Sequence, residues 1–434
     1  MASERYREVA EQAWAWVRRQ IRHDSQGIWI PETVPHDEAV PAWRDGLHSG
    51  VGGLGLLAAE IRLTRPLTPA EDELVSHVLA RVTSDVRVTT EAGYFDGLVG
   101  HLAVLGALDA EGIEDVVSRL LSLATADGWS TSIVGPPKFL EGARLNDATL
   151  GSAGVLLGAV WALRRLVPGA QELANLAADV VVREAETLPR GRLRWQMVSP
   201  RFRATPPTDM PNWSHGTAGI AAALALAASA LNRADLSRAA VAGAEHLVEL
   251  NEGGAAGFEV PRYVPPVPDE EPLSYGWCHG SSGTSLLFAA LEQTGVTEVA
   301  SVSPQFWRER CLNSVRASGV PDRLRPGFWD NDGRCCGTAG VGDIVLDVDE
   351  PASLHFAQRL GDALVERATV DGDTAYWQFL DSTSPTPLQP PGVGWMQGAA
   401  GISAFLFRLA RAVEGDRRTV DRLDSWWTLG RGPG

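Results

Sequence analysis

The sequence predicts an all-α fold, an α/α toroid built from seven pairs of inner and outer helices. Three observations favour it. A short pattern, Gly-x-x-Gly followed by an apolar run, recurs seven times along the 434 residues. More amphipathic segments lie between the copies, and the pattern is complete in both the first and the last copy. Repeats of this length each form one supersecondary unit that buries its apolar face against its neighbours.

The glycine pattern marks the start of each repeat. Its copies begin 47 to 65 residues apart, a regularity that is hard to obtain by chance. Because glycine has no Cβ, these positions let the chain turn sharply and enter a helix close to its neighbours. The copies are Gly50-Val-Gly-Gly53, Gly97-Leu-Val-Gly100, Gly151-Ser-Ala-Gly154, Gly216-Thr-Ala-Gly219, Gly280-Ser-Ser-Gly283, Gly337-Thr-Ala-Gly340 and Gly398-Ala-Ala-Gly401.

Each repeat has room for two helices. Residues 154–166 and 219–231 are apolar on most faces, which is typical of helices buried in a core. Residues 237–250 and 353–365 are amphipathic and predict outer helices. At about 1.5 Å per residue, two helices and their loops fit one repeat. Alternating β-type segments are few, so a parallel sheet is disfavoured.

The ends of the chain favour a closed ring over an open solenoid. A solenoid needs polar capping repeats, whereas the first and last copies here keep the glycines and the apolar helix. We therefore expect a single domain over residues 1–434, with a helical lead-in over about 1–40 and a tail over about 425–434. The Pro-rich stretches 264–272 and 382–393 are interpreted as surface insertions within that domain.

Charge and composition exclude several classes of function. The formal net charge of −16 makes nucleic acid an unexpected partner. The first 25 residues are charged throughout, unlike a signal peptide, and no apolar stretch is long enough for a membrane span. Four cysteines in 434 residues do not make a disulfide framework. A cytoplasmic protein is expected.

Three of the four cysteines lie at matching positions in their repeats, just before the first glycine of the Gly-x-x-Gly pattern. Cys278 lies two residues before Gly280, and Cys335 and Cys336 directly precede Gly337. Adjacent units of a ring bring such loops together at one rim. Thiolates are strong zinc ligands, and three protein ligands with an open fourth position are typical of catalytic zinc. The pattern predicts a zinc ion held by Cys278, Cys335 and Cys336, with the open position available to water or a substrate sulfur.

Other interpretations of these polar groups stay open. Cysteine is often a small buried hydrophobe, which is the interpretation we give to Cys311 in its helix-like stretch. His279 is a competing ligand that would replace one of the two adjacent cysteines. His48 and His101 are interpreted as polar groups of loops.

A histidine and an aspartate lie before the first glycine of two earlier repeats, at the same rim. His215 directly precedes Gly216, and Asp147 lies four residues before Gly151. A histidine titrates near neutrality and a carboxylate can orient it, so the two predict a proton-transfer pair. Local capping of a helix start is the alternative interpretation of each residue by itself. A thiolate site in the same ring favours the pair.

These motifs together resemble the LanC-like family, the lanthionine synthetase C-like cyclases. The resemblance runs from about Gly46 to Leu409 and rests on the seven glycine loops, Ser214-His215-Gly216, the loop before Gly280 and the Cys-Cys-Gly337 loop. It implies an α/α toroid with zinc at one end. Bacterial members of the family add a cysteine thiol of a ribosomally made peptide to a dehydroalanine or dehydrobutyrine of the same peptide, forming lanthionine or methyllanthionine, often for an antibiotic.

The resemblance also implies roles for individual residues. Cys278 and Cys335 match the two family cysteine ligands, and Cys336 stands where most members have histidine. His215 matches the proposed acid/base histidine and Asp147 the aspartate that acts with it. A third thiolate would make the zinc a weaker Lewis acid and leave a bound substrate thiolate more nucleophilic.

A second departure from the family lies just before Cys278. Many bacterial members carry an arginine there, which is missing here; Tyr275 or Arg334 are candidates to replace it. The implied partners are a dehydrated precursor peptide as substrate and a separate dehydratase, because the sequence carries no glycine-rich phosphate loop.

There are three alternatives to a peptide cyclase, of which the first two stay open. One is an enzyme of the same family that adds glutathione or another free thiol to dehydro residues in proteins. Another is a non-catalytic scaffold that binds a modified peptide or a partner enzyme. The third is a zinc prenyltransferase-like toroid, which the Cys-Cys-Gly loop does not fit.

Overall fold

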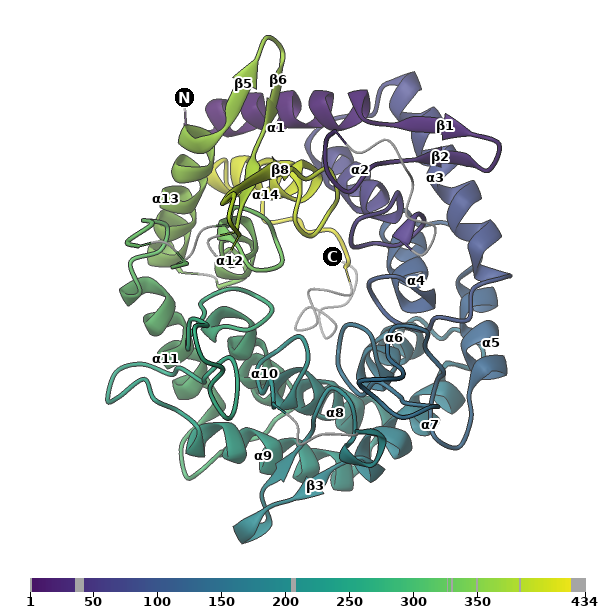
Figure 1. The fold of residues 1–434 in the computed structure, drawn as a ribbon, viewed down its shortest axis with the longest axis vertical. Helices are drawn as coiled ribbons and strands as arrows, with labels where there is room; N and C mark the ends of the chain where they lie inside the picture. The colour runs from purple at the N-terminus through teal and green to yellow at the C-terminus, as the bar shows by residue number, and fades with distance from the viewer. Residues whose placement is uncertain are drawn as a thin grey trace.

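The helices form a closed ring, seen down its axis in Figure 1. The computed structural model describes residues 2–35, 43–203, 208–325, 327–328, 331–348, 350–381 and 384–422. The predicted tail over about 425–434 lies outside the described residues. Within them, no helix is long and apolar enough to cross a membrane.

Seven helices of the described chain form the inner layer. Each begins one or two residues after the first glycine of a repeat, and each is buried along most of its length. Their apolar composition on all faces explains this burial, since both the ring interior and the outer helices cover them. The inner helices are α2 (Gly52–Thr64), α4 (Leu98–Ala107), α6 (Ser152–Arg164), α8 (Thr217–Leu231), α10 (Ser281–Gln293), α12 (Thr338–Val345) and α14 (Ala399–Val413).

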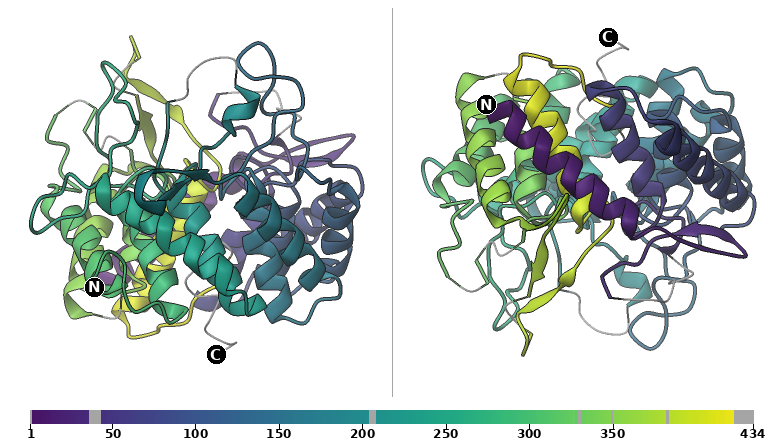
Figure 2. Two further views of the ribbon diagram at one scale, coloured as in Figure 1. Left: turned by 90° about the horizontal axis from the view of Figure 1, so that it is seen from below. Right: turned by 90° about the horizontal axis from the view of Figure 1, so that it is seen from above.

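The outer layer is amphipathic and buries one face against the inner layer. Six outer helices each follow their inner partner along the chain: α3 (Pro69–Val86), α5 (Ile113–Leu123), α7 (Ala170–Arg183), α9 (Ala234–Glu249), α11 (Pro304–Ala317) and α13 (Pro351–Arg367). The seventh comes from the other end of the chain. Helix α1 (Ala2–Arg19) packs along α14, side by side with it in both Figure 1 and Figure 2. Part of the predicted lead-in is thus the outer helix of the last repeat.

The described strands are short and form four antiparallel hairpins. They pair β1 (Arg22–Asp24) with β2 (Gly27–Trp29), β3 (Glu186–Thr187) with β4 (Leu193–Arg194), β5 (Thr369–Asp371) with β6 (Thr374–Tyr376), and β7 (Gln378–Leu380) with β8 (Leu388–Pro391). The last hairpin includes much of the second Pro-rich stretch. Long loops and the hairpins of the last repeats project from one face of the helical layer (Figure 2).

A chain of hydrogen bonds runs around the ring through the glycine loops. The residue two positions before the first glycine donates its amide to the equivalent carbonyl of the next repeat, at 2.8 to 3.3 Å. Thr149 makes the link with its hydroxyl instead, 3.3 Å from the carbonyl of Ser214. The last link joins the amide of Met396 to the carbonyl of His48 at 3.1 Å, so the seventh repeat returns to the first. The predicted all-α toroid is therefore confirmed, and it is closed.

The repeated glycines are explained by close packing. None of the fourteen adopts a positive φ. At the second glycine of each repeat, a Cβ would collide with the backbone carbonyl six residues earlier in its own loop, for example that of Arg334 at Gly340. The loop can fold back onto the first turn of its inner helix only where no side chain intervenes.

Candidate metal centre and proton-transfer pair

The three predicted cysteine ligands meet at one point of the rim. The sulfurs of Cys278, Cys335 and Cys336 all lie within 4.8 Å of one another. Cys278 stands in the loop before α10, and the other two stand in the loop before α12. The amide of Cys278 donates to the carbonyl of Cys335 at 3.1 Å, so the hydrogen bonds that link the loops also bring the sulfurs together.

The donor set fits a zinc ion. Tetrahedral Zn–S bonds of about 2.3 Å place sulfurs about 3.8 Å apart, within the spacing of this cluster. All three cysteines are free thiols. Hydrogen bonds from Cys278 and Cys335 lower the pKa of Cys336, while hydrogen bonds to Cys278 and Cys336 raise the pKa of Cys335. The thiols of the cluster therefore differ in acidity, and a divalent metal would supply the charge that holds three thiolates together.

His215 and Asp147 are also in contact, across adjacent repeats. The His215 Nδ1 lies 2.5 Å from Oδ2 of Asp147, which is fully buried. The other carboxylate oxygen accepts the amide of Leu150 at 3.0 Å. This second bond holds a turn of the loop and does not cap α6, whose N-cap is Gly151 without a side-chain cap, so of the two interpretations Asp147 makes the contact with His215 and not the helix cap. With Nδ1 bonded to the carboxylate, Nε2 is the nitrogen of His215 left to exchange a proton.

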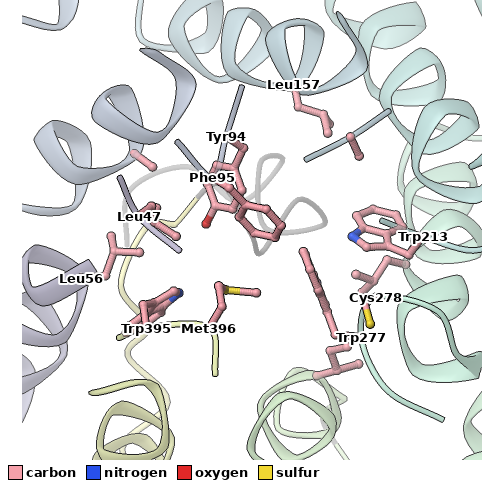
Figure 3. Packing of buried hydrophobic residues seen from close by; sticks show 14 of the residues in the cluster. Leu47, Leu56, Tyr94, Phe95, Leu157, Trp213, Trp277, Cys278, Trp395 and Met396 are labelled. Carbon is pink, nitrogen blue, oxygen red and sulfur yellow. The ribbon is translucent and has the colours of Figure 1, made fainter. Parts of the chain in front are cut away.

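One cavity of about 400 Å³ joins the two groups. Its lining includes His215 together with Cys278, Cys335 and Cys336. Asp147 does not line the cavity, because it lies behind the imidazole. Figure 3 shows the Cys278 side chain among aromatic side chains that point into the ring, including Phe95, Trp213 and Trp277.

His279 lines the same cavity but stands apart from the sulfur cluster. It does not belong to the group of donor atoms that lie within 4.8 Å of one another. Its ring centre lies 5.4 Å from that of His215. Burial lowers the pKa of His279 to about 3, so the ring is neutral at pH 7. The geometry favours the three cysteines over His279 as ligands.

His48 is more closely associated with the site than the sequence predicts for a polar group of a loop. It lies in a loop, as predicted, but it lines the cavity, and its ring packs edge-on against Phe95 with centres 4.9 Å apart. Burial lowers its pKa to about 4. A signal was present in the sequence: His48 lies two residues before Gly50, the place that Cys278 and Cys335 hold in their own repeats.

The prediction of His101 as a loop residue is wrong. His101 lies inside α4 and is buried, with Nε2 2.7 Å from Oδ2 of Asp85 on α3. This hydrogen bond ties an inner helix to its outer partner. Cys311 lies buried within α11, as expected of a structural residue.

The first Pro-rich stretch continues into a wall of the cavity. Glu271, Leu273 and Tyr275 line it from one side, and Phe328 faces them, its ring centre 5.9 Å from that of Tyr275. Of the two candidates to replace the missing arginine, Tyr275 lines the cavity. Arg334 does not, because its side chain is buried against Asp343 at 2.7 Å.

A family model and one solved structure agree with this architecture. A family model described as lanthionine synthetase C-like protein matches residues 41–417. No curated protein matches the chain. Among solved structures, a nisin cyclase aligns with a TM-score of 0.58 at 14% identity, over 98% of this chain and 97% of that one. An unsaturated glucuronyl hydrolase specific for heparin aligns with a TM-score of 0.48 at 10% identity, over 96% of this chain and 99% of that one.

Proposed function

The chain belongs to the lanthionine synthetase C-like family, and we propose that it is a zinc-dependent cyclase that forms thioether rings in a dehydrated peptide. The observation that carries the proposal is the shared cavity. Three thiols with a metal-ligand spacing and a histidine oriented by a buried carboxylate line the same space of about 400 Å³. Addition of a thiol to a dehydro residue requires an activated sulfur and a proton donor within reach of one substrate.

The metal would supply the first requirement. A zinc ion held by Cys278, Cys335 and Cys336 would lower the pKa of a substrate thiol, so that the thiol reacts as thiolate at neutral pH. The wall that contains Leu273, Tyr275 and Phe328 gives the cavity an apolar side against which a short length of peptide can pack. A cavity at the low end of the usual size for ligand sites holds only the reacting residues and their neighbours.

His215 would supply the second requirement. Its Nε2 gains the proton that the substrate thiol loses and delivers it to the α-carbon after the C–S bond forms. Asp147 keeps the Nδ1 side of the ring protonated and fixes its orientation, and the Thr149 hydroxyl oxygen lies 3.2 Å from the same carboxylate oxygen, so its single hydrogen is shared between this oxygen and the carbonyl of Ser214. Proton transfer by a positioned side chain contributes about 10²- to 10⁴-fold to rate.

We propose that the substrate is a precursor peptide already carrying dehydroalanine or dehydrobutyrine, supplied by a separate dehydratase. The sequence carries no glycine-rich phosphate loop with which to activate Ser or Thr. In the same proposal the protein acts in the cytoplasm, where reducing conditions keep the three thiols free.

The test uses a synthetic peptide with one cysteine and one dehydroalanine. The protein with zinc should consume the free thiol, measured by alkylation, without changing the peptide mass, because ring closure is an internal addition. His215→Ala should slow this step about 10²-fold or more. His355→Ala, which removes an exposed histidine on α13, should leave it unchanged.

Other outcomes of the same assay identify the alternatives. A mass increase equal to glutathione, when glutathione is supplied, would replace the cyclase with an enzyme that adds free thiols. Binding of the peptide without any loss of its thiol would favour the scaffold. Normal ring formation by His215→Ala would remove the role assigned to that residue.

A further inference from the structure

One arginine lines the cavity that holds the cysteines and His215. Arg262 precedes the Pro-rich stretch, in the loop between α9 and α10, and it carries the single guanidinium among the described residues of the lining. Its amide donates to the carbonyl of Pro272 at 2.8 Å, so the stretch closes into a loop that presents Arg262 to the cavity.

The guanidinium of Arg262 is only loosely engaged. Its Nη1 lies 3.3 Å from Oε2 of Glu270 and 3.5 Å from the carbonyl of Glu271, and its side chain is 24% exposed. Strong charge-assisted hydrogen bonds are nearer 2.8 Å. An arginine has five N–H donors, and both of these contacts use Nη1. The ring of Tyr263 supports the group from one side, 5.2 Å from its carbon Cζ.

Other arginines of the same region are held much more firmly. Arg325, on the facing loop, binds Glu271 through two bonds of 3.0 and 3.1 Å. Arg334 is buried against Asp343. Arg262 therefore stands out as a cation that is held in place through its backbone while its donors remain available in the cavity.

The proposed reaction creates an anion in this space. When the thiolate sulfur bonds to the β-carbon of the dehydro residue, the π electrons between the α- and β-carbons form a double bond from the α-carbon to the carbonyl carbon, and the carbonyl π electrons move onto its oxygen. The enolate then takes a proton at the α-carbon from His215, and the carbonyl is restored, so the thiol proton ends on carbon. Preorganised donors at such an oxygen act most strongly in a cavity shielded from water.

We propose that Arg262 binds this developing enolate oxygen, as a catalytic residue of the thioether-forming reaction. The inference rests on the proposed function. The planar guanidinium suits an oxygen with negative charge, and it is the one permanently charged cation among the described residues that line the cavity. Tyr275, whose pKa burial raises to about 12, is the neutral donor of the same wall.

The test compares Arg262→Gln, Arg262→Lys and Arg325→Gln with the wild type, using the peptide assay with zinc present. Loss of an oxyanion donor costs about 10²- to 10³-fold in kcat, so Arg262→Gln should lose about that much with little change in KM. Arg262→Lys should recover part of the loss. Arg325→Gln is the matched control, because it breaks an ion pair on the same wall while leaving the cavity cation in place.

Two further measurements separate catalysis from structure. Zinc per chain and the thermal unfolding midpoint of Arg262→Gln should equal those of the wild type. A kcat of Arg262→Gln within threefold of the wild type would overturn the proposal. An equal loss of kcat in Arg262→Gln and Arg325→Gln would also overturn it, because the loss would then come from disturbing the cavity wall and not from removing the cation. A wild type that closes no ring would instead overturn the proposed function, and this inference with it.

Discussion

At the scale of single residues, the site depends on the contacts of the two carboxylate oxygens of Asp147 and on the third sulfur, that of Cys336. Asp147 uses one oxygen to hold its own loop and the other to hold His215. The family resemblance implies a histidine at the place of Cys336, so the proposed donor set would hold three thiolates and not two, which would weaken the Lewis acidity of a bound zinc. Such a site would suit activation of sulfur more than polarisation of a carbonyl.

Removal of Cys336 should remove one metal ligand. We expect one zinc per chain in the wild type and a loss of zinc affinity of about 100-fold or more in Cys336→Ala, since even residues behind the ligands contribute 10- to 100-fold. Zinc per chain after dialysis against a weak chelator measures this. Cys311→Ala is the control, a buried thiol on α11 that should keep one zinc.

Two other results of the zinc measurement would contradict this prediction. One zinc in both Cys336→Ala and the wild type would make His279 or another group the third ligand. No zinc in either protein, even after metal is resupplied, would favour the scaffold.

At the scale of elements, the unit of this protein is a loop that folds back onto the first turn of an inner helix. The loop before α12 carries Cys335 and Cys336, and its carbonyl at Arg334 lies where a Cβ of Gly340 would have to be. Movement of the backbone at this point would disturb the hydrogen bond of 2.8 Å from the amide of Cys335 to the carbonyl of Met396. Glycine at this position thus serves both the fold and the placement of two sulfurs.

A methyl group at Gly340 should therefore disturb both the fold and the placement of the two sulfurs. We expect Gly340→Ala to reduce the free energy of unfolding by about 3 kcal/mol, the upper range for overpacking, and to weaken zinc binding as the loop shifts. Urea unfolding monitored by circular dichroism measures the first effect. Gly135→Ala is the control, because a Cβ at Gly135 meets nothing within 4 Å. Equal stability of the two variants would contradict the packing explanation.

At the scale of the whole molecule, closure of the ring uses both ends of the described chain. Helix α1 completes the last repeat from outside. The segment after α14 returns to the interior, where Asp421 accepts the indole N–H of Trp161 at 3.2 Å and Arg422 binds Asp343 at 2.6 Å. These contacts connect the segment after α14 to α6, in a distant repeat, and to α12, in the neighbouring repeat.

Asp343 is the centre of this closure. It is buried and accepts from three arginines, Arg334, Arg408 and Arg422, at 2.6 to 2.7 Å. Burial opposes its ionisation, but the charges of these arginines outweigh burial and hold its pKa well below the usual value of 3.8. Because the folded-state pKa is lowered, the carboxylate contributes its full stability above about pH 4, and this contribution falls as the pH drops below that value.

Asp343→Asn should accordingly destabilise the fold. Breaking a buried ion-pair network by removing one partner costs about 3–5 kcal/mol, because three arginines lose their shared anion. The expected result is a clear drop in the unfolding midpoint at pH 7 that becomes smaller toward pH 3. Asp373→Asn, at an exposed pair with Arg19, should leave the midpoint unchanged. A midpoint of Asp343→Asn equal to that of the wild type would refute the role of the network.

The sequence by itself determined the repeat, the inner and outer helices, the closed ring and the identity of the groups that meet at the rim. It could do so because glycine spacing and apolar periodicity are local properties, and equal places in a repeat become neighbours in a ring. Only the tertiary structure decided that α1 belongs to the last repeat, that Arg262 lines the cavity and that Arg334 turns toward Asp343. These placements depend on side-chain direction and on contacts between residues up to several hundred positions apart, which no local pattern encodes.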